Sequence, residues 1–482
     1  MTDDVEGPRA WDLDQYSVQA RRQRREARRA EIAEAAAAGE VPTDLDEAYQ
    51  TDDDDGDWLA PAEEKKRPRF VLSGSIFWIA LTGAVLTVLT LGFYRFWMIT
   101  NLRRAYAGSV RFDGDPLEYT GTGFEKLIGF LIAISMLAVY LALANIGLVF
   151  AGLSTLDEGA LIAPFSLLAV APFYFWAQYR GQRYLLARLR WRGIRFGLAN
   201  GSWSYMLRSL LWSALTVASL GFLYPFQHFR QARFIANRTY FGSLKMEQGG
   251  SWLGLLAYWI WLYIAAGMIF LAAWGLAEEM QLGEQGIGIM LSIFMPIAIL
   301  ILFILYMNYQ VGAFRYLWDN RKIAKATLEN DVSAKAIVWT YIKGSFIVSI
   351  LTTVIGAIVG VIFIGGGAFL TAALLGGQEA AQGILREDLE ALLQENAVPT
   401  ADLLLNALPL VVGIAVTYFM LFALSFSFTQ SMITQPILRA KVEAMLVRNP
   451  AALNRAQQRE RDDAVEAGGF ADALNVDVGG GI

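Results

Sequence analysis

Arginine is the residue type whose placement in this chain suggests chemistry most strongly. Arg104, Arg183, Arg233 and Arg315 each follow an apolar run by one or two helical turns, which would put them at the headgroup level of a bilayer. A guanidinium group binds phosphate through two parallel hydrogen bonds. The four arginines are therefore candidate contacts for phosphate or anionic lipid headgroups. The alternative is that their charge only anchors the topology of the chain.

Residues that commonly carry catalysis are scarce. The chain has no cysteine and a single histidine, His228. A thiolate nucleophile, a disulfide and a His-rich metal site are therefore excluded, and a Ser-His-Asp triad has only one candidate base. His228 lies in an aromatic cluster, which favours an interfacial aromatic over a pH sensor. No Gly-rich loop ends in Gly-Lys-Ser/Thr. We expect no enzyme activity, no catalytic residue, no metal and no cofactor.

Apolar runs long enough to cross a bilayer recur along the chain. A helix needs about 20 mainly apolar residues to cross the hydrocarbon. Five runs meet that length: Leu127–Leu153, Trp252–Trp274, Ile287–Gly312, Gly344–Leu375 and Leu403–Met432. Their centres carry no charged side chain, which disfavours a proton relay. Gly356 and Gly360 form a Gly-x-x-x-Gly step that predicts close helix packing.

The charge of the loops predicts a topology. Arg180–Arg208, Arg230–Lys245 and Arg315–Lys343 are basic, whereas Ala277–Gln285 and Gly376–Asp402 are mainly acidic. The positive-inside rule then places the basic loops and both termini in the cytoplasm, with a multi-pass chain in a bacterial inner membrane.

Two further apolar runs have basic sequence at both ends. A simple span cannot begin and end on one side, so Ile76–Trp97 and Met206–Phe229 predict short or re-entrant hairpins. The sequence therefore predicts an all-α, polytopic helical membrane protein with about six full spans plus two such hairpins. Eight full spans is the alternative.

Composition divides the chain into three parts. Residues 1–69 form a charged cytoplasmic tail with a predicted helix at Arg21–Ala38, and no early apolar segment resembles a signal peptide. Residues 70–440 form the membrane domain, and 441–482 form a polar cytoplasmic tail. Within the membrane domain, Val88–Tyr94 matches Val217–Leu223, which predicts an internal repeat of span pairs.

Several of these segments also resemble a known family. Arg111–Gly123 with Lys126–Leu131, Leu89–Tyr94 leading to Trp97, and Arg233–Gly242 resemble the YjgN-like bacterial inner-membrane proteins. The resemblance covers roughly residues 70–440. It implies a helical inner-membrane protein and brings no established activity with it.

The predicted function is that of an integral inner-membrane protein, a transport or channel-like helical bundle. The alternative is a non-transporting scaffold that organises lipids or partner proteins through its basic inner face and tail. A membrane enzyme acting on lipid is a third interpretation, supported only by the arginines. The expected partners are the bilayer and its anionic lipids, and no nucleic acid.

Overall fold

The computed structural model describes residues 65–72, 74–150, 162–279, 284–374, 377 and 401–459. These residues belong to one unit of the chain, which begins at Glu64. The predicted helix Arg21–Ala38 and most of the predicted outer loop Gly376–Asp402 lie outside the described residues.

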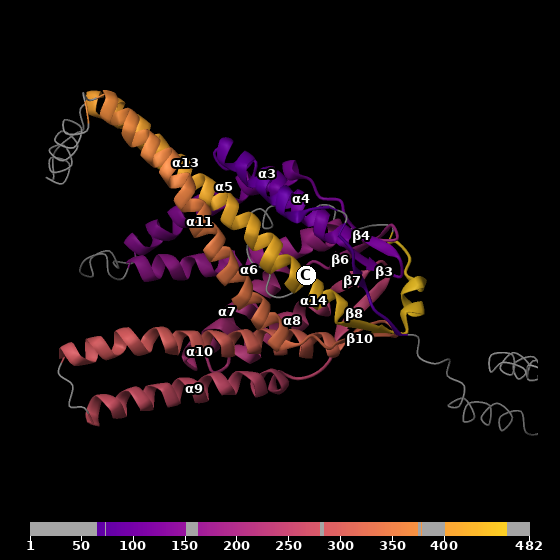
Figure 1. Ribbon diagram of the computed structural model, residues 1–482. Helices are drawn as coiled ribbons and strands as arrows, with labels where there is room; N and C mark the ends of the chain where they lie inside the picture. The colour runs from indigo at the N-terminus through magenta and orange to yellow at the C-terminus, as the bar shows by residue number, and fades with distance from the viewer. Residues whose placement is uncertain are drawn as a thin grey trace, which may run out of the picture. The chain divides into compact units, whose positions relative to one another are not determined.

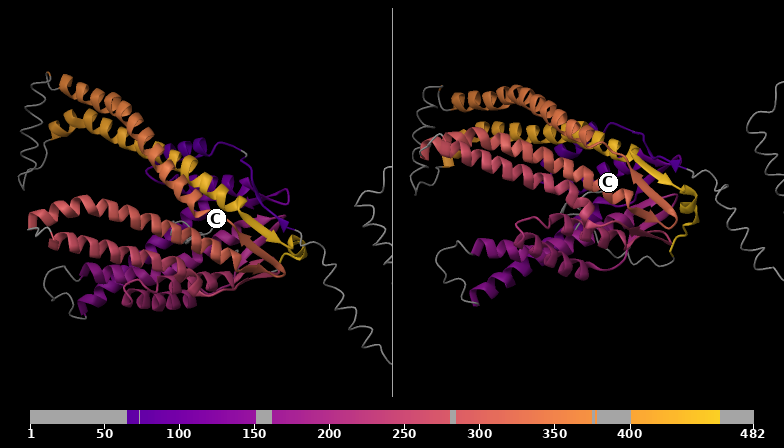
Figure 2. Two further views of the ribbon diagram at one scale, coloured as in Figure 1. Left: turned by 60° about the horizontal axis from the view of Figure 1, so that its bottom comes forward. Right: turned by 90° about the horizontal axis from the view of Figure 1, so that it is seen from below.

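Long apolar helices occupy the predicted spans. Their bounds are Gly123–Phe150 for α5, Ile162–Arg188 for α6, Trp252–Glu279 for α9, Glu284–Asp319 for α10, Ala334–Leu374 for α11 and Ala401–Thr429 for α13. α13 continues through a π-helical turn, Gln430–Thr434, into α14, Gln435–Glu443. The pairs α9–α10 and α11–α13 run side by side, and the strands gather near one end of these helices (Figures 1 and 2).

Among the described residues, five helices are long and apolar enough to cross a membrane, so the predicted counts of six and eight spans are wrong. α6 is not one of the five, and its C-terminal part carries arginines such as Arg180 and Arg183. α3, Ile76–Leu89, has 14 residues and therefore a length of about 21 Å, which is less than the roughly 30 Å of bilayer hydrocarbon.

Two short helical hairpins cover the runs Ile76–Trp97 and Met206–Phe229, for which short or re-entrant hairpins were predicted. α3 pairs with α4, Arg95–Ser109, and α7, Ser202–Ala218, pairs with α8, Tyr224–Ala236. The two connecting turns share one geometry, with positive φ at Leu91 and Gly92 (50° and 94°) and at Leu220 and Gly221 (52° and 90°). Both leucines are 90% exposed at the tips of the hairpins.

A sheet joins the helices, and its presence shows that the all-α prediction was wrong. The eleven strands follow the order β1-β11-β10-β9-β8-β7-β6-β5-β4-β3-β2, and each neighbouring pair is antiparallel. The strands are Lys65–Lys66, Arg69–Phe70, Val110–Phe112, Asp115–Tyr119, Leu189–Trp191, Ile194–Leu198, Thr239–Phe241, Leu244–Gln248, Arg321–Ile323, Ala326–Asn330 and Met445–Arg448, for β1 to β11 in chain order. Each strand has only two to five residues, and most of them lie in segments whose sequence indicates basic loops.

The tight turns show why these loops fold as hairpins. Asp113 and Gly114 have φ values of 55° and 88°, and Arg192 and Gly193 have 51° and 75°. Two consecutive positive φ values match a type I′ turn, whose twist fits that of the flanking strands. Each of these β-hairpins therefore begins within a few residues of the end of one helix and ends within a few residues of the start of the next.

The sheet curls until its two edges meet in one segment of the chain. β1 and β2 are the two edge strands, yet only Arg67 and Pro68 separate them. Three peptide units join Lys66 to Arg69 and reach at most about 11 Å. Pro68 lacks an N–H group and so suits the gap between two ladders. The curved sheet and this short link therefore form a ring that the backbone closes at Lys65–Phe70, which we call the seam, without pairing between β1 and β2.

The inner face of this ring holds an apolar core. Trp191, Phe241 and Val447 pack there against Leu453, which lies in the 3₁₀ helix η4, Pro450–Arg455. Gln457 extends this contact, since its backbone N–H donates to the Ser243 hydroxyl over 3.2 Å. Residues 450–459 thus form a C-terminal strap across the ring.

Candidate functional site

The four predicted arginines share one position relative to the sheet. Each lies six residues before the first residue of a strand, as the pairs 104 and 110, 183 and 189, 233 and 239, and 315 and 321 show. Six residues of helix rise about 9 Å. The four arginines therefore precede the sheet by the same number of residues, each on a different helix.

A fifth arginine, Arg439, occupies the same position and was missed as a candidate ligand. It lies six residues before Met445, the first residue of β11. In the sequence, Arg439 is marked only as one of several basic residues near the C-terminus. Its spacing could not be recognised because strand β11 was not predicted. Five arginines therefore each lie six residues before a strand of the ring. We call this shared position the register and the five residues the register arginines.

The five arginines have different surroundings. Arg183 is buried, whereas the other four are exposed. Arg315 and Arg439 each pair with a carboxylate one turn further along the helix, at 3.7 Å to Asp319 and 2.9 Å to Glu443. Exposed pairs of this kind contribute little to stability, but they do occupy donors of the guanidinium group.

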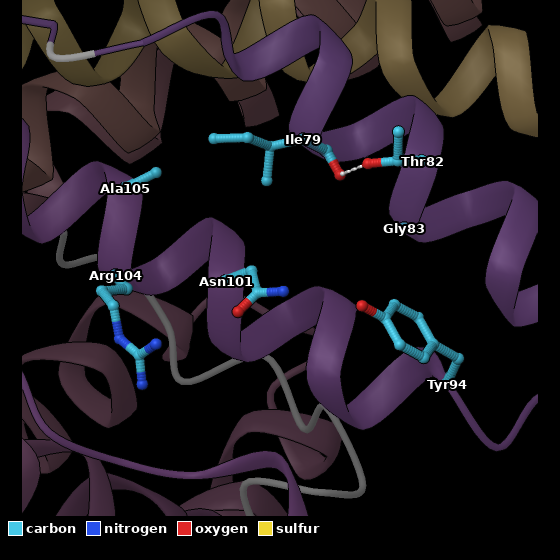
Figure 3. Close-up of a pocket in the computed structure, with 7 residues that line it drawn as sticks. All are labelled: Ile79, Thr82, Gly83, Tyr94, Asn101, Arg104 and Ala105. Atoms are coloured by element: carbon cyan, nitrogen blue, oxygen red, sulfur yellow. Dashed lines mark hydrogen bonds between the residues drawn. The ribbon is translucent and has the colours of Figure 1, made fainter.

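A groove between α3 and α4 contains the first of these arginines (Figure 3). Its volume is about 420 Å³, which lies within the usual range for small-molecule sites. The lining residues are Ile79, Thr82 and Gly83 from α3 and Tyr94, Asn101, Arg104 and Ala105 from α4. We call this hollow the α3–α4 groove. Arg104 is the only one of the five arginines in its lining.

The guanidinium group of Arg104 has more N–H donors than its hydrogen bonds to the described residues use. One of its terminal nitrogens donates to the Gly121 carbonyl oxygen over 3.3 Å. Among the described residues, no carboxylate pairs with Arg104. Figure 3 shows the Tyr94 hydroxyl directed toward Asn101, with Arg104 about one turn further along α4. The groove therefore offers a cation and neutral hydrogen-bonding groups, which is a suitable set for an anion.

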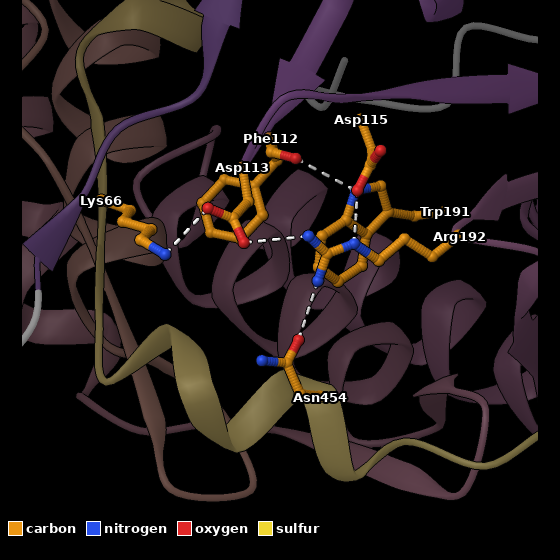
Figure 4. A network of polar contacts seen from close by, with 7 residues as sticks. All are labelled: Lys66, Phe112, Asp113, Asp115, Trp191, Arg192 and Asn454. Atoms are coloured by element: carbon orange, nitrogen blue, oxygen red, sulfur yellow. Dashed lines mark hydrogen bonds and ion pairs between the residues drawn. The ribbon is translucent and has the colours of Figure 1, made fainter.

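A second polar cluster joins separate strands of the ring (Figure 4). Arg192 contacts Asp115, Asp113 at 2.9 Å and Asn454 at 2.9 Å, and Lys66 pairs with Asp113 at 2.8 Å. Hydrogen bonds from Lys66 and Arg192 hold the pKa of the Asp113 carboxyl below its usual value. Every charged group of the cluster has a partner of opposite sign, so the arrangement is structural: it ties the seam and the strap to two hairpin turns.

The two glycines predicted to pack helices differ in their surroundings. Gly356 lies against Leu421 of α13 so closely that a Cβ atom would clash with it. Gly360 has ordinary contacts, since a Cβ atom would lie 3.9 Å from Thr417. The backbones of α11 and α13 also come close at Gly367 and Gly413, where an added Cβ atom would meet the carbonyl oxygens of Pro409 and Phe363. The sequence pattern includes Gly367, since Gly365–Gly367 extend the Gly-x-x-x-Gly step, but it does not include Gly413.

His228 lies in an aromatic cluster on α8. Its Nδ1 atom is 2.9 Å from the Tyr309 hydroxyl, and its ring contacts that of Tyr224. Within the part of the chain that the structure describes, no three His, Cys, Asp or Glu side chains are grouped so that they could hold a metal ion.

These features define a class of protein: a membrane protein in which pairs of helices are connected through a curved antiparallel sheet. The chain belongs to the family described as bacterial protein of unknown function (DUF898), which matches residues 72–353. The YjgN-like resemblance is thereby confirmed over residues 72–353. Comparisons with curated proteins and with solved structures each give no match to the chain.

Proposed function

We propose that this protein is a non-transporting, non-enzymatic scaffold of the bacterial inner membrane that organises anionic lipids. The observation that carries the proposal is the exposure of the candidate spans. Only 6–17% of the residues in their most apolar windows are buried within the chain. Large apolar side chains such as Phe270, Ile299 and Val361 remain exposed along them. Helices of this kind offer their surface to lipid rather than enclosing a path for a solute.

The register of the five arginines supports the lipid part of the proposal. Cations about 9 Å from the sheet, at the base of the helices, suit the headgroup layer of a bilayer. The outward strand positions add basic residues such as Arg111, Arg195 and Lys245. We therefore place the sheet, and with it both termini, on the cytoplasmic side, following the positive-inside rule.

Transport through a helical bundle is the second candidate, and one observation favours it. The order helix pair then β-hairpin recurs along the chain, and the turns at Leu91 and Leu220 have the same geometry. We propose that this order arose by duplication of a helix pair and hairpin, and duplicated units are common in transporters. The exposure of the spans weighs against a transport path within a single chain.

Reconstitution in liposomes separates the two candidates. We expect the purified protein to retain phosphatidylglycerol in native mass spectrometry and to give no flux of ions or dyes above that of empty vesicles. Replacing all five register arginines with glutamine should reduce the retained lipid, whereas five glutamines in the N-terminal tail (Arg21, Arg22, Arg24, Arg25 and Arg28) remove the same charge outside the register and should reduce it less. Saturable flux through the wild-type protein would contradict the scaffold proposal.

A further inference from the structure

We propose that the α3–α4 groove is a specific site for one phospholipid, with the phosphate bound by Arg104. This inference rests on the proposed lipid-organising function and deepens it, because it assigns one site to one class of ligand. The other four arginines of the register would contribute only general attraction for anionic lipid.

The polar lining of the groove matches a phosphate group. Arg104 provides a guanidinium that no described carboxylate neutralises, and a planar fork binds two phosphate oxygens at once. Asn101 is exposed and can donate from its amide, and the Tyr94 hydroxyl can donate to a further oxygen. Tyr94, Asn101 and Arg104 share one face of α4, since seven and ten residues separate them along the helix.

The surface next to the groove matches acyl chains. α3 forms the other wall and exposes Trp78, Val85, Leu86 and Leu89, the last of these 72% exposed. Val85, Leu86 and Leu89 follow Gly83 toward the apolar tip of the hairpin, whereas Trp78 precedes Ile79 at the other end of α3. A free phosphate ion would leave that surface uncovered, whereas a phospholipid would place its phosphate at Arg104 and its chains along α3. The geometry therefore favours a lipid over inorganic phosphate.

Arg315 supplies a matched comparison. It lies at the same position in the register and is exposed, but it pairs with Asp319 and lies outside the lining of the groove. Exchanging either arginine for lysine keeps the charge and removes the planar fork. Only a site that uses the fork should respond to this exchange.

The test measures lipid retention by native mass spectrometry on purified full-length protein, with added phosphatidylglycerol. We expect Arg104→Lys to lower the affinity for one bound lipid about tenfold, because paired charge-assisted bonds are replaced by a point contact. Asn101→Ala, an exposed change that should leave folding intact, should lower it several-fold. Arg315→Lys should have no effect. Diacylglycerol, which has the chains without the phosphate, should not bind at this site, and millimolar inorganic phosphate should not displace the lipid.

Each other outcome overturns the inference in a recognisable way. Equal losses in Arg104→Lys and Arg315→Lys would mean that binding is shared across the register; the scaffold proposal would survive and the specific site would not. Displacement by inorganic phosphate would identify a free-anion site instead of a lipid site. Unchanged retention in both Arg104→Lys and Asn101→Ala would remove the groove from lipid binding altogether. Flux through the wild-type protein tests the scaffold proposal and leaves these results unaffected.

Discussion

Phe70 is the side chain that closes the ring of strands, and its removal should open the seam. It lies in β2, is 7% exposed, and packs against Val110 of β3 and against Leu438 and Val442 of α14, which leads into β11. Replacing a buried phenylalanine with alanine costs about 3–5 kcal/mol. The seam can partly collapse into the space, so for Phe70→Ala we expect the lower value, about 3 kcal/mol.

Hydrogen–deuterium exchange of the backbone measures this change directly. The seam pairs on one side through Lys65 and Lys66 with β11, and on the other through Arg69 and Phe70 with β3. A loss of about 3 kcal/mol corresponds to roughly 100-fold faster exchange. Because six consecutive residues supply both ladders, amides in residues 65–72 and 445–448 should lose protection together in Phe70→Ala.

The control is Phe124→Ala, which removes a phenylalanine that is 61% exposed on α5 and should leave exchange at the seam unchanged. The reasoning is refuted if protection is lost between β2 and β3 while β1 and β11 exchange at the wild-type rate. In that case the two edges would open independently, and the strands would not act as a closed ring.

Three further predictions concern the strap and the turns. Leu453→Ala should destabilise the strap by about 2–4 kcal/mol and speed tryptic cleavage at Arg455, because Leu453 is buried in the core of the ring. Gly242→Ala should also release the strap, since φ there is +53° and a Cβ atom would meet the Gln457 carbonyl oxygen at 2.5 Å; faster cleavage at the same bond would show it. The folded pKa of Asp113 lies below the unfolded value of about 3.9, so its stabilising effect is complete above that pH and is lost as the pH falls through the folded pKa. Melting temperatures of the wild-type protein and Asp113→Asn should therefore differ by a constant amount from pH 7 to 5 and converge below about pH 4.

The sequence predicted the apolar helices because long apolar runs are a strong local signal. It did not predict the sheet, because strands of two to five residues depend on partners far along the chain rather than on their own pattern. The turns at Asp113-Gly114 and Arg192-Gly193 were the available clue, since both pairs fit a type I′ hairpin.

The candidate site was predicted in part. The four arginines were selected by their spacing from apolar runs, whereas their common distance from the strands becomes visible only once the strands are known. The groove at Arg104 depends on how α3 and α4 pack, where Gly83 lies close to Met98, and no single-helix pattern reports that contact. The cytoplasmic orientation of both termini remains a prediction.

The seam has a consequence for the synthesis of the protein. Lys65 pairs with Arg448, so partners in one ladder are 383 residues apart (448 minus 65). The ribosome completes Lys65–Phe70 before any candidate span exists, and the strand's final partner emerges only after the last helix. Helices can therefore enter the membrane one pair at a time while the edges of the growing sheet stay unpaired and open to wrong partners. A chain that stops before Met445 would contain all the candidate spans but would lack β11, the strand that pairs with Lys65 and Lys66. The sheet of such a chain would stay open at this edge, so completion of the sheet depends on the last strand.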